Sequence, residues 1–78
     1  MPLLIVENGY RAELPGLGSK SPFPELSEKR VTGAVRENLS EKYGWDAAEV
    51  SCTAHYDGQV WRGTCKIAKG RFEYHLSK

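Results

Sequence analysis

The sequence lacks any long hydrophobic run, and this absence limits what the chain can be. The apolar stretch at its start, LLIV, ends after four residues at Glu7. A membrane-spanning helix needs about 20 apolar residues and a signal-peptide core needs about seven or more. We therefore expect no membrane contact and a cytoplasmic location. At 78 residues, 40% of them hydrophobic, the chain is long enough for one core, so we predict a single domain over residues 1–78.

Metal-ligating side chains are also scarce. The chain has two cysteines, Cys52 and Cys65, and two histidines, His55 and His75. Strand alternation places the cysteines on one face and the histidines on the other, so the four cannot share a zinc ion. We expect no metal and no cofactor. With no export signal we expect reduced, buried thiols, because cytosolic disulfides are rare; a disulfide is the alternative.

A strong excess of charge of one sign is missing as well. The net charge is +1, but residues 1–49 hold six Lys and Arg against eight Asp and Glu, whereas residues 50–78 hold five against two. The second part is thus at +3 and the first at −2. This asymmetry is smaller than the basic stripe of a dedicated nucleic-acid binder.

Residues 50–77 predict a three-stranded antiparallel meander. Asp57-Gly58 and Lys69-Gly70 are two-residue hairpin signals. Counting outward from both turns places the apolar residues on one face, because strand side chains alternate. That face comprises Val50, Cys52, Ala54, Trp61, Cys65, Ile67, Phe72, Tyr74 and Leu76. The opposite face is almost wholly polar, so the apolar face needs a covering layer.

The meander register has one open alternative. With two two-residue turns, Lys66 lies opposite Glu73, which is a favourable cross-strand pair. A four-residue loop over residues 57–60 would leave both faces unchanged and would place Cys52 directly opposite Cys65.

The Asn8-Gly9 dipeptide predicts a first hairpin over residues 3–14. In its two-residue-turn register the apolar side carries Leu3, Ile5, Ala12 and Leu14. The mixed side carries Leu4, Val6, Arg11 and Glu13.

Residues 15–24 contain three prolines and two glycines, and they predict a loop without regular structure. Phe23 is the residue of this loop that we expect to contact the core. If Phe23 is exposed instead, the loop becomes a contact surface.

Residues 25–43 predict the long helix. Ser27 is its expected N-cap and Gly44 its left-handed C-terminal residue. The apolar stripe of this helix, which we expect to cover the sheet, comprises Val31, Val35, Leu39 and Tyr43. A single helical turn capped by Asp46 follows. The fold class is α+β, with one helix on one face of an antiparallel sheet and the order β-β-α-β-β-β.

Two glycines lie inside predicted elements. Gly33 costs about 1 kcal/mol relative to alanine in a helix, and we expect it to allow close packing. Gly63 lies mid-strand on the apolar face, which predicts a close approach to its backbone by the helix or by Trp61.

No catalytic constellation follows from these placements. His55 and His75 are two strands apart and offset by four positions. Two carboxylates do not converge either, because Asp57 lies in a turn and Glu73 faces Lys66. We therefore expect no catalytic residues and no enzyme.

The exposed sheet face is the expected partner-binding surface. Its candidate residues are Arg62, Lys66, Arg71, His55 and His75. Nucleic-acid binding through this basic face is the alternative function. Single-strand binders present aromatic side chains for base stacking, whereas the meander aromatics here point to the covered face.

The cysteine-bearing hairpin after a helix is similar to small extracytoplasmic helix-plus-sheet domains over the second half of the chain. No site residue follows from that similarity. We expect a small non-enzymatic protein that binds a larger protein or ribonucleoprotein complex. A phage or mobile-element inhibitor of host machinery, of the anti-CRISPR kind, fits this size and the absence of site chemistry.

Overall fold

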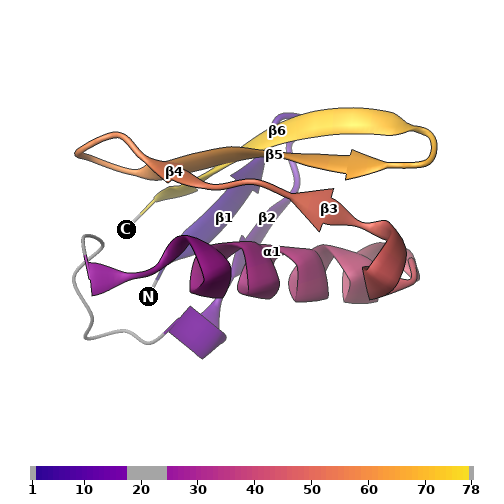
Figure 1. Ribbon diagram of the computed structural model, residues 1–78, viewed down its shortest axis with the longest axis horizontal. Helices are drawn as coiled ribbons and strands as arrows, with labels where there is room; N and C mark the ends of the chain where they lie inside the picture. The colour runs from indigo at the N-terminus through magenta and orange to yellow at the C-terminus, as the bar shows by residue number, and fades with distance from the viewer. Residues whose placement is uncertain (1, 18–24, 78) are drawn as a thin grey trace.

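The computed structural model describes residues 2–17 and 25–77 and places a helix under one face of an antiparallel sheet (Figure 1). The elements are β1 (Leu3–Val6), β2 (Arg11–Glu13), η1 (Pro15–Leu17), α1 (Glu28–Tyr43), η3 (Ala47–Glu49), β3 (Ser51–Cys52), β4 (His55–Tyr56), β5 (Trp61–Ile67) and β6 (Gly70–Ser77). The sheet has six strands in the order β2-β1-β6-β5-β3, and β4 also pairs with β5. The predicted α+β class is confirmed.

Helix α1 begins and ends where its capping residues predict. The Ser27 side chain accepts a hydrogen bond from the Arg30 amide, and Gly44 adopts the left-handed conformation at φ 72°. The first helical residue is therefore Glu28, whereas the expected helix range began at residue 25. Within the described parts of the chain, no helix has both the length and the apolar character needed to cross a bilayer.

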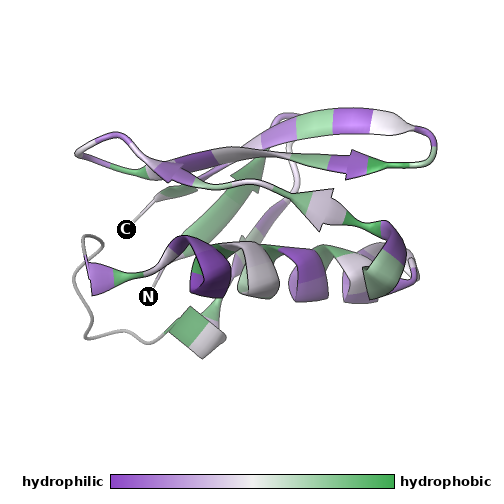
Figure 2. Cartoon of the chain, in the orientation of Figure 1, coloured by the Kyte–Doolittle hydropathy of each residue, from purple (hydrophilic) through white to green (hydrophobic). Residues whose placement is uncertain are grey.

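The core lies between α1 and the sheet. Its largest fully buried side chains are Leu4, Leu17, Leu39, Leu76, Val31, Val35 and Cys65. Strands β5 and β6 alternate between hydrophilic and hydrophobic residues, whereas β1 is hydrophobic throughout (Figure 2). The alternation lets β5 and β6 bury one face and keep the other in water.

Two expectations for α1 are wrong. Tyr43 is 38% exposed rather than in the core, and it stacks on Trp45 with ring centroids 4.5 Å apart. A Cβ built on Gly33 would meet no atom within 4 Å. Gly33 therefore does not serve close packing.

The first hairpin has a register one residue away from the expected one. Leu4 pairs with Ala12 and Ile5 with Arg11. The turn has three loop residues, because the Val6 amide donates to the Tyr10 carbonyl at 2.9 Å. A shift of one residue exchanges the faces of a strand, so Leu4 and Val6 are buried in place of Leu3 and Ile5.

The loop prediction for residues 15–24 is wrong at its start, because Pro15–Leu17 forms a turn of 3-10 helix. Leu17 in this turn is 2% exposed and belongs to the core. Phe23 lies outside the described residues. The single turn capped by Asp46 is confirmed as η3, since the Asp46 carboxylate accepts a hydrogen bond from the Ala48 amide.

Both meander turns differ from the predicted ones, and each moves the pairing by two residues. Tyr56 pairs with Trp61 across a four-residue loop. The Asp57 carboxylate holds this loop by accepting hydrogen bonds from the amides of Gln59 and Val60, both at 2.9 Å. The four-residue alternative is therefore the correct one.

The second turn consists of Ala68 and Lys69, because Ile67 pairs with Gly70. Lys66 consequently lies opposite Arg71, and Glu73 lies opposite Thr64. The predicted Lys66 to Glu73 pair is wrong. Because both registers move by an even number of residues, the assignment of side chains to faces is unchanged.

A disulfide joins Cys52 on β3 to Cys65 on β5, so the expectation of reduced thiols is wrong. The four-residue loop brings the two residues directly opposite one another. Cys65 is fully buried and Cys52 is half-buried. The bond links an edge strand to the interior of the sheet.

Candidate functional site

No helix or strand that the structure describes covers the face of the sheet opposite α1, and strand pairing arranges the side chains of this face in rows. His55 on β4 pairs with Arg62 on β5, and Arg62 pairs with His75 on β6. The three side chains therefore form one row across three strands. Ile5 on β1 pairs with His75 and continues the row.

This row corrects the expected separation of the histidines. They are two strands apart but not offset along the strands, because both pair with Arg62. Two strand spacings amount to about 10 Å. Arg62 thus has a histidine directly opposite it on each neighbouring strand.

A second basic row lies farther along β5 and β6. Lys66 pairs with Arg71 there, and Ser51 on β3 pairs with Lys66. All five residues expected to bind a partner are therefore on one face. We call them the basic face: His55, Arg62, Lys66, Arg71 and His75. His75 is half-buried and the other four are exposed.

Arg62 is held in place by an ion pair with Asp57. Its Nε lies 2.8 Å from the Asp57 Oδ2, and the arginine side chain remains 63% exposed. The amide of Val60 first, and then Arg62 and the amide of Gln59, donate hydrogen bonds that lower the pKa of Asp57. The carboxylate stays ionised and orients Arg62, whose guanidinium carries further N–H donors for a ligand.

The basic face is hollowed at its centre, where a depression of about 400 Å³ lies over β5 and β6. Its lining includes the row of His55, Arg62 and His75 and, from the neighbouring row, Glu73 with Glu7 beside it. Basic and acidic side chains thus border the same depression, so the sign of the charge differs between its edges.

Two glutamates, Glu7 and Glu73, also line the depression. Glu73 does not face Lys66, and the Glu7 amide donates a hydrogen bond to the Glu73 carbonyl at 3.0 Å. Glu7, the residue after β1, therefore lies beside Glu73 on β6. Sequence reasoning missed Glu7 because pairing of β1 with β6 joins segments far apart in the chain.

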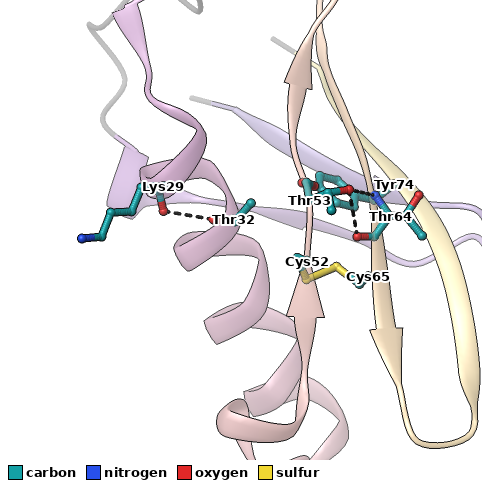
Figure 3. Close-up of a disulfide and its surroundings, with 7 residues drawn as sticks. All are labelled: Lys29, Thr32, Cys52, Thr53, Thr64, Cys65 and Tyr74. Atoms are coloured by element: carbon teal, nitrogen blue, oxygen red, sulfur yellow. Dashed lines mark hydrogen bonds between the residues drawn. A yellow bond between two sulfur atoms is a disulfide. The ribbon is translucent and has the colours of Figure 1, made fainter.

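The floor of the depression contains an unusual exchange of hydrogen bonds around Thr53. The Thr53 amide donates to the Thr64 carbonyl at 2.8 Å, but the Thr64 amide donates to the Thr53 hydroxyl at 3.1 Å. The Thr53 carbonyl accepts a hydrogen bond from the Tyr74 hydroxyl instead (Figure 3). The side chain of Thr53 thus replaces its own carbonyl in the sheet, and the strand is interrupted between β3 and β4.

This exchange explains Gly63. A Cβ on Gly63 would lie 1.9 Å from the Thr53 carbonyl oxygen and 2.7 Å from the Tyr74 hydroxyl. The close approach predicted at Gly63 exists, but a neighbouring strand and Tyr74 make it, not the helix or Trp61. Burial, with a smaller contribution from Glu28, raises the pKa of the Tyr74 hydroxyl, so this group donates its hydrogen at neutral pH.

The aromatic residues of the meander lie on the covered side, as expected. Trp61 and Tyr74 are buried, and Tyr56 and Phe72 are half-buried against the core. The rows of the basic face contain no aromatic residue. Among the described residues, no group of three His, Cys, Asp or Glu is placed to hold a metal ion.

Comparison of the chain with protein-family models, with curated proteins and with solved structures gives no match.

Proposed function

We propose that this protein is a non-enzymatic binding protein that contacts an acidic surface of a larger protein or ribonucleoprotein complex through its basic face. The observation that carries this proposal is the row of His55, Arg62 and His75 across three strands. The Lys66 and Arg71 pair extends the positive charge along the same face. Charge complementarity of this kind increases association rates and selects partners.

The depression makes partner recognition by the basic face more specific than positive charge alone would. Its rim is basic on one side and acidic at Glu7 and Glu73, so a purely anionic surface would meet repulsion at one edge. A partner with a carboxylate next to a cationic or hydrogen-bonding group fits both sides.

We favour a protein over a nucleic acid as the partner of the basic face. Glu73 lies between the two basic rows, where it would repel a phosphate backbone. Among the described residues of the meander, the Phe, Tyr and Trp side chains lie on the covered side, so only the two histidine rings of this face could stack on bases. Nucleic-acid binding through the same face is therefore the alternative that the experiment must separate.

The test compares two double variants. Arg62→Glu with Lys66→Glu reverses two charges on the basic face, and Arg30→Glu with Lys42→Glu makes the same charge change on α1. Each immobilised protein is incubated with nuclease-treated and untreated cell extract. A partner retained by wild type and by the α1 variant, but lost with the basic-face variant, supports the proposal.

The salt dependence of that interaction then identifies the class of partner. A protein partner should show an association rate that falls with salt and with the basic-face variant. An affinity that falls steeply with salt, and is lost after nuclease treatment, would indicate nucleic acid. Retention of the partner by the basic-face variant would place the interaction elsewhere.

An inhibitor of host machinery encoded by a phage or mobile element, such as an anti-CRISPR protein, is a narrower form of this proposal. Identification of the retained partner as a defence or transcription complex would support it. The Cys52 to Cys65 disulfide argues against this narrower form and for an oxidising compartment, because disulfides persist where thiols are not kept reduced. Alkylation of intact cells before lysis tests this: a protected pair supports an oxidising compartment, and alkylated thiols support the cytoplasm.

A further inference from the structure

A second surface lies on the other side of the edge strand, away from the basic face. A groove of about 380 Å³ runs between α1 and β3. Its walls are Lys29, Thr32, Gly33 and Arg36 from the helix and Ala48, Val50, Ser51 and Cys52 from the strand side. None of the residues in the basic face contributes to it.

The strand wall of the groove offers the backbone groups of Cys52, whereas the amide of Val50 already donates to the Ala47 carbonyl at 3.2 Å. Strand β3 ends the strand order of the sheet, and β5 is its partner among the described strands. The Thr53 amide points to β5 and bonds to the Thr64 carbonyl. Because backbone groups alternate in direction along a strand, the amide and carbonyl of Cys52 point to the free edge.

Gly33 lies in the middle of the helix wall, where the lack of a side chain leaves the groove open. A Cβ there would meet nothing within 4 Å, so no packing requires glycine. Glycine nevertheless costs about 1 kcal/mol relative to alanine at such a position. A locally unfavourable residue without a packing role is typical of a functional position.

The charge on the helix wall is of one sign. Lys29 and Arg36 line the groove, and none of its described lining residues is an Asp or a Glu. Both cations are exposed, and they are seven positions apart, which places them on the same side of the helix with Gly33 between them. In the close-up, the side chain of Lys29 points outward from the helix, away from Cys52 (Figure 3).

We propose that this groove binds an extended acidic peptide segment of a partner protein, which adds to the sheet as a strand beside β3. The peptide backbone exchanges hydrogen bonds with Cys52, and its carboxylates pair with Lys29 and Arg36. Strand addition between a sheet edge and a helix is a known mode of peptide recognition. This site is separate from the basic face and does not depend on the function proposed for that face.

The test uses a fluorescein-labelled, N-acetylated heptapeptide of alternating Val and Glu as the probe. Fluorescence polarisation should show saturable binding, and amide chemical shifts should change at Gly33, Ser51 and Cys52. A peptide with Lys in place of Glu should bind at least about tenfold more weakly. A Val and Glu peptide N-methylated at alternate residues should lose binding as well, because it keeps the charge but cannot pair as a strand.

Protein variants separate this site from the basic face. Gly33→Leu fills the groove with a good helix former and should weaken the probe at least about tenfold without unfolding the protein. Arg36→Glu should weaken it similarly. Arg62→Glu with Lys66→Glu should leave it unchanged.

Several outcomes would overturn the proposal. These are no saturable binding of the probe, equal binding of the N-methylated peptide, unchanged binding by a folded Gly33→Leu variant, or chemical-shift changes confined to the basic face. A dimer in solution with the β3 amides protected from exchange would also overturn it, since a second copy of the chain would then occupy the edge.

Discussion

Tyr74 on β6 donates its hydroxyl hydrogen to the backbone carbonyl of Thr53 on the far side of β5, with the two oxygens 2.5 Å apart. This bond is possible because Gly63, which lies between them on β5, has no side chain. The three residues tie three strands together at the floor of the depression. The same arrangement interrupts the edge strand beside the disulfide.

The first prediction concerns the two glycines inside secondary structure. Gly63→Ala should lower the free energy of unfolding by about 1–3 kcal/mol or more, because its Cβ would overlap a backbone carbonyl. Gly33→Ala is the matched control and should raise the same free energy by up to about 1 kcal/mol. Urea titrations of both variants measure these changes. Equal effects of the two substitutions would contradict the close contact at Gly63.

The second prediction concerns the buried phenol of Tyr74. Its pKa is raised by burial, so the folded state holds the proton more tightly than the unfolded state. The resulting stability is complete below about pH 10 and is lost as the pH rises further. Tyr74→Phe should cost about 1–3 kcal/mol at pH 7, because the Thr53 carbonyl loses its donor.

The pH dependence of unfolding distinguishes this role from simple packing. Between pH 9 and pH 11, the stability of wild type should fall more steeply than that of the Tyr74→Phe variant. The pKa of Tyr10 is also raised by burial, so the stability of both proteins should still fall somewhat with pH in this range. Parallel curves for the two proteins would show that Tyr74 does not titrate as described.

The third prediction concerns the disulfide. Thiol reagent should not label Cys52 or Cys65 in denaturant unless a reductant is added, because both are in the bond. Reduction should lower the stability by about 2–4 kcal/mol. The control is the double variant Cys52→Ala with Cys65→Ala, whose melting temperature should not respond to the reductant. Labelling of the denatured protein without reductant would refute the bond.

The fourth prediction compares two aromatic residues in different surroundings. Trp61 is 6% exposed in the core, whereas Tyr43 is 38% exposed at the end of α1. Trp61→Ala should cost about 3–5 kcal/mol. Tyr43→Ala should cost about 1 kcal/mol, mainly through its stack on Trp45. A Trp61→Ala variant that melts within a degree or two of wild type would contradict the assignment of faces.

The helix and the faces of the meander could be predicted from the order of residues along the chain. Ser27 and Gly44 define the ends of α1 through local backbone bonds. The meander faces were predictable because alternation of apolar and polar residues survives an error of two in the turns. For this reason all five residues of the basic face were identified without the structure.

Three features depend on the tertiary structure and could not be predicted from the alternation of apolar and polar residues. LLIV in β1 has no polar residue, so its buried face depends on the three-residue turn before Tyr10 and on pairing with β6. The Asp57 carboxylate stabilises a four-residue loop through hydrogen bonds to two backbone amides, and this loop places Cys52 opposite Cys65. The loop shifts the strand register by two residues, which leaves the alternation of apolar and polar residues unchanged. The row of His55, Arg62 and His75, and the neighbouring Glu7, exist only once strands distant in the chain are hydrogen-bonded side by side.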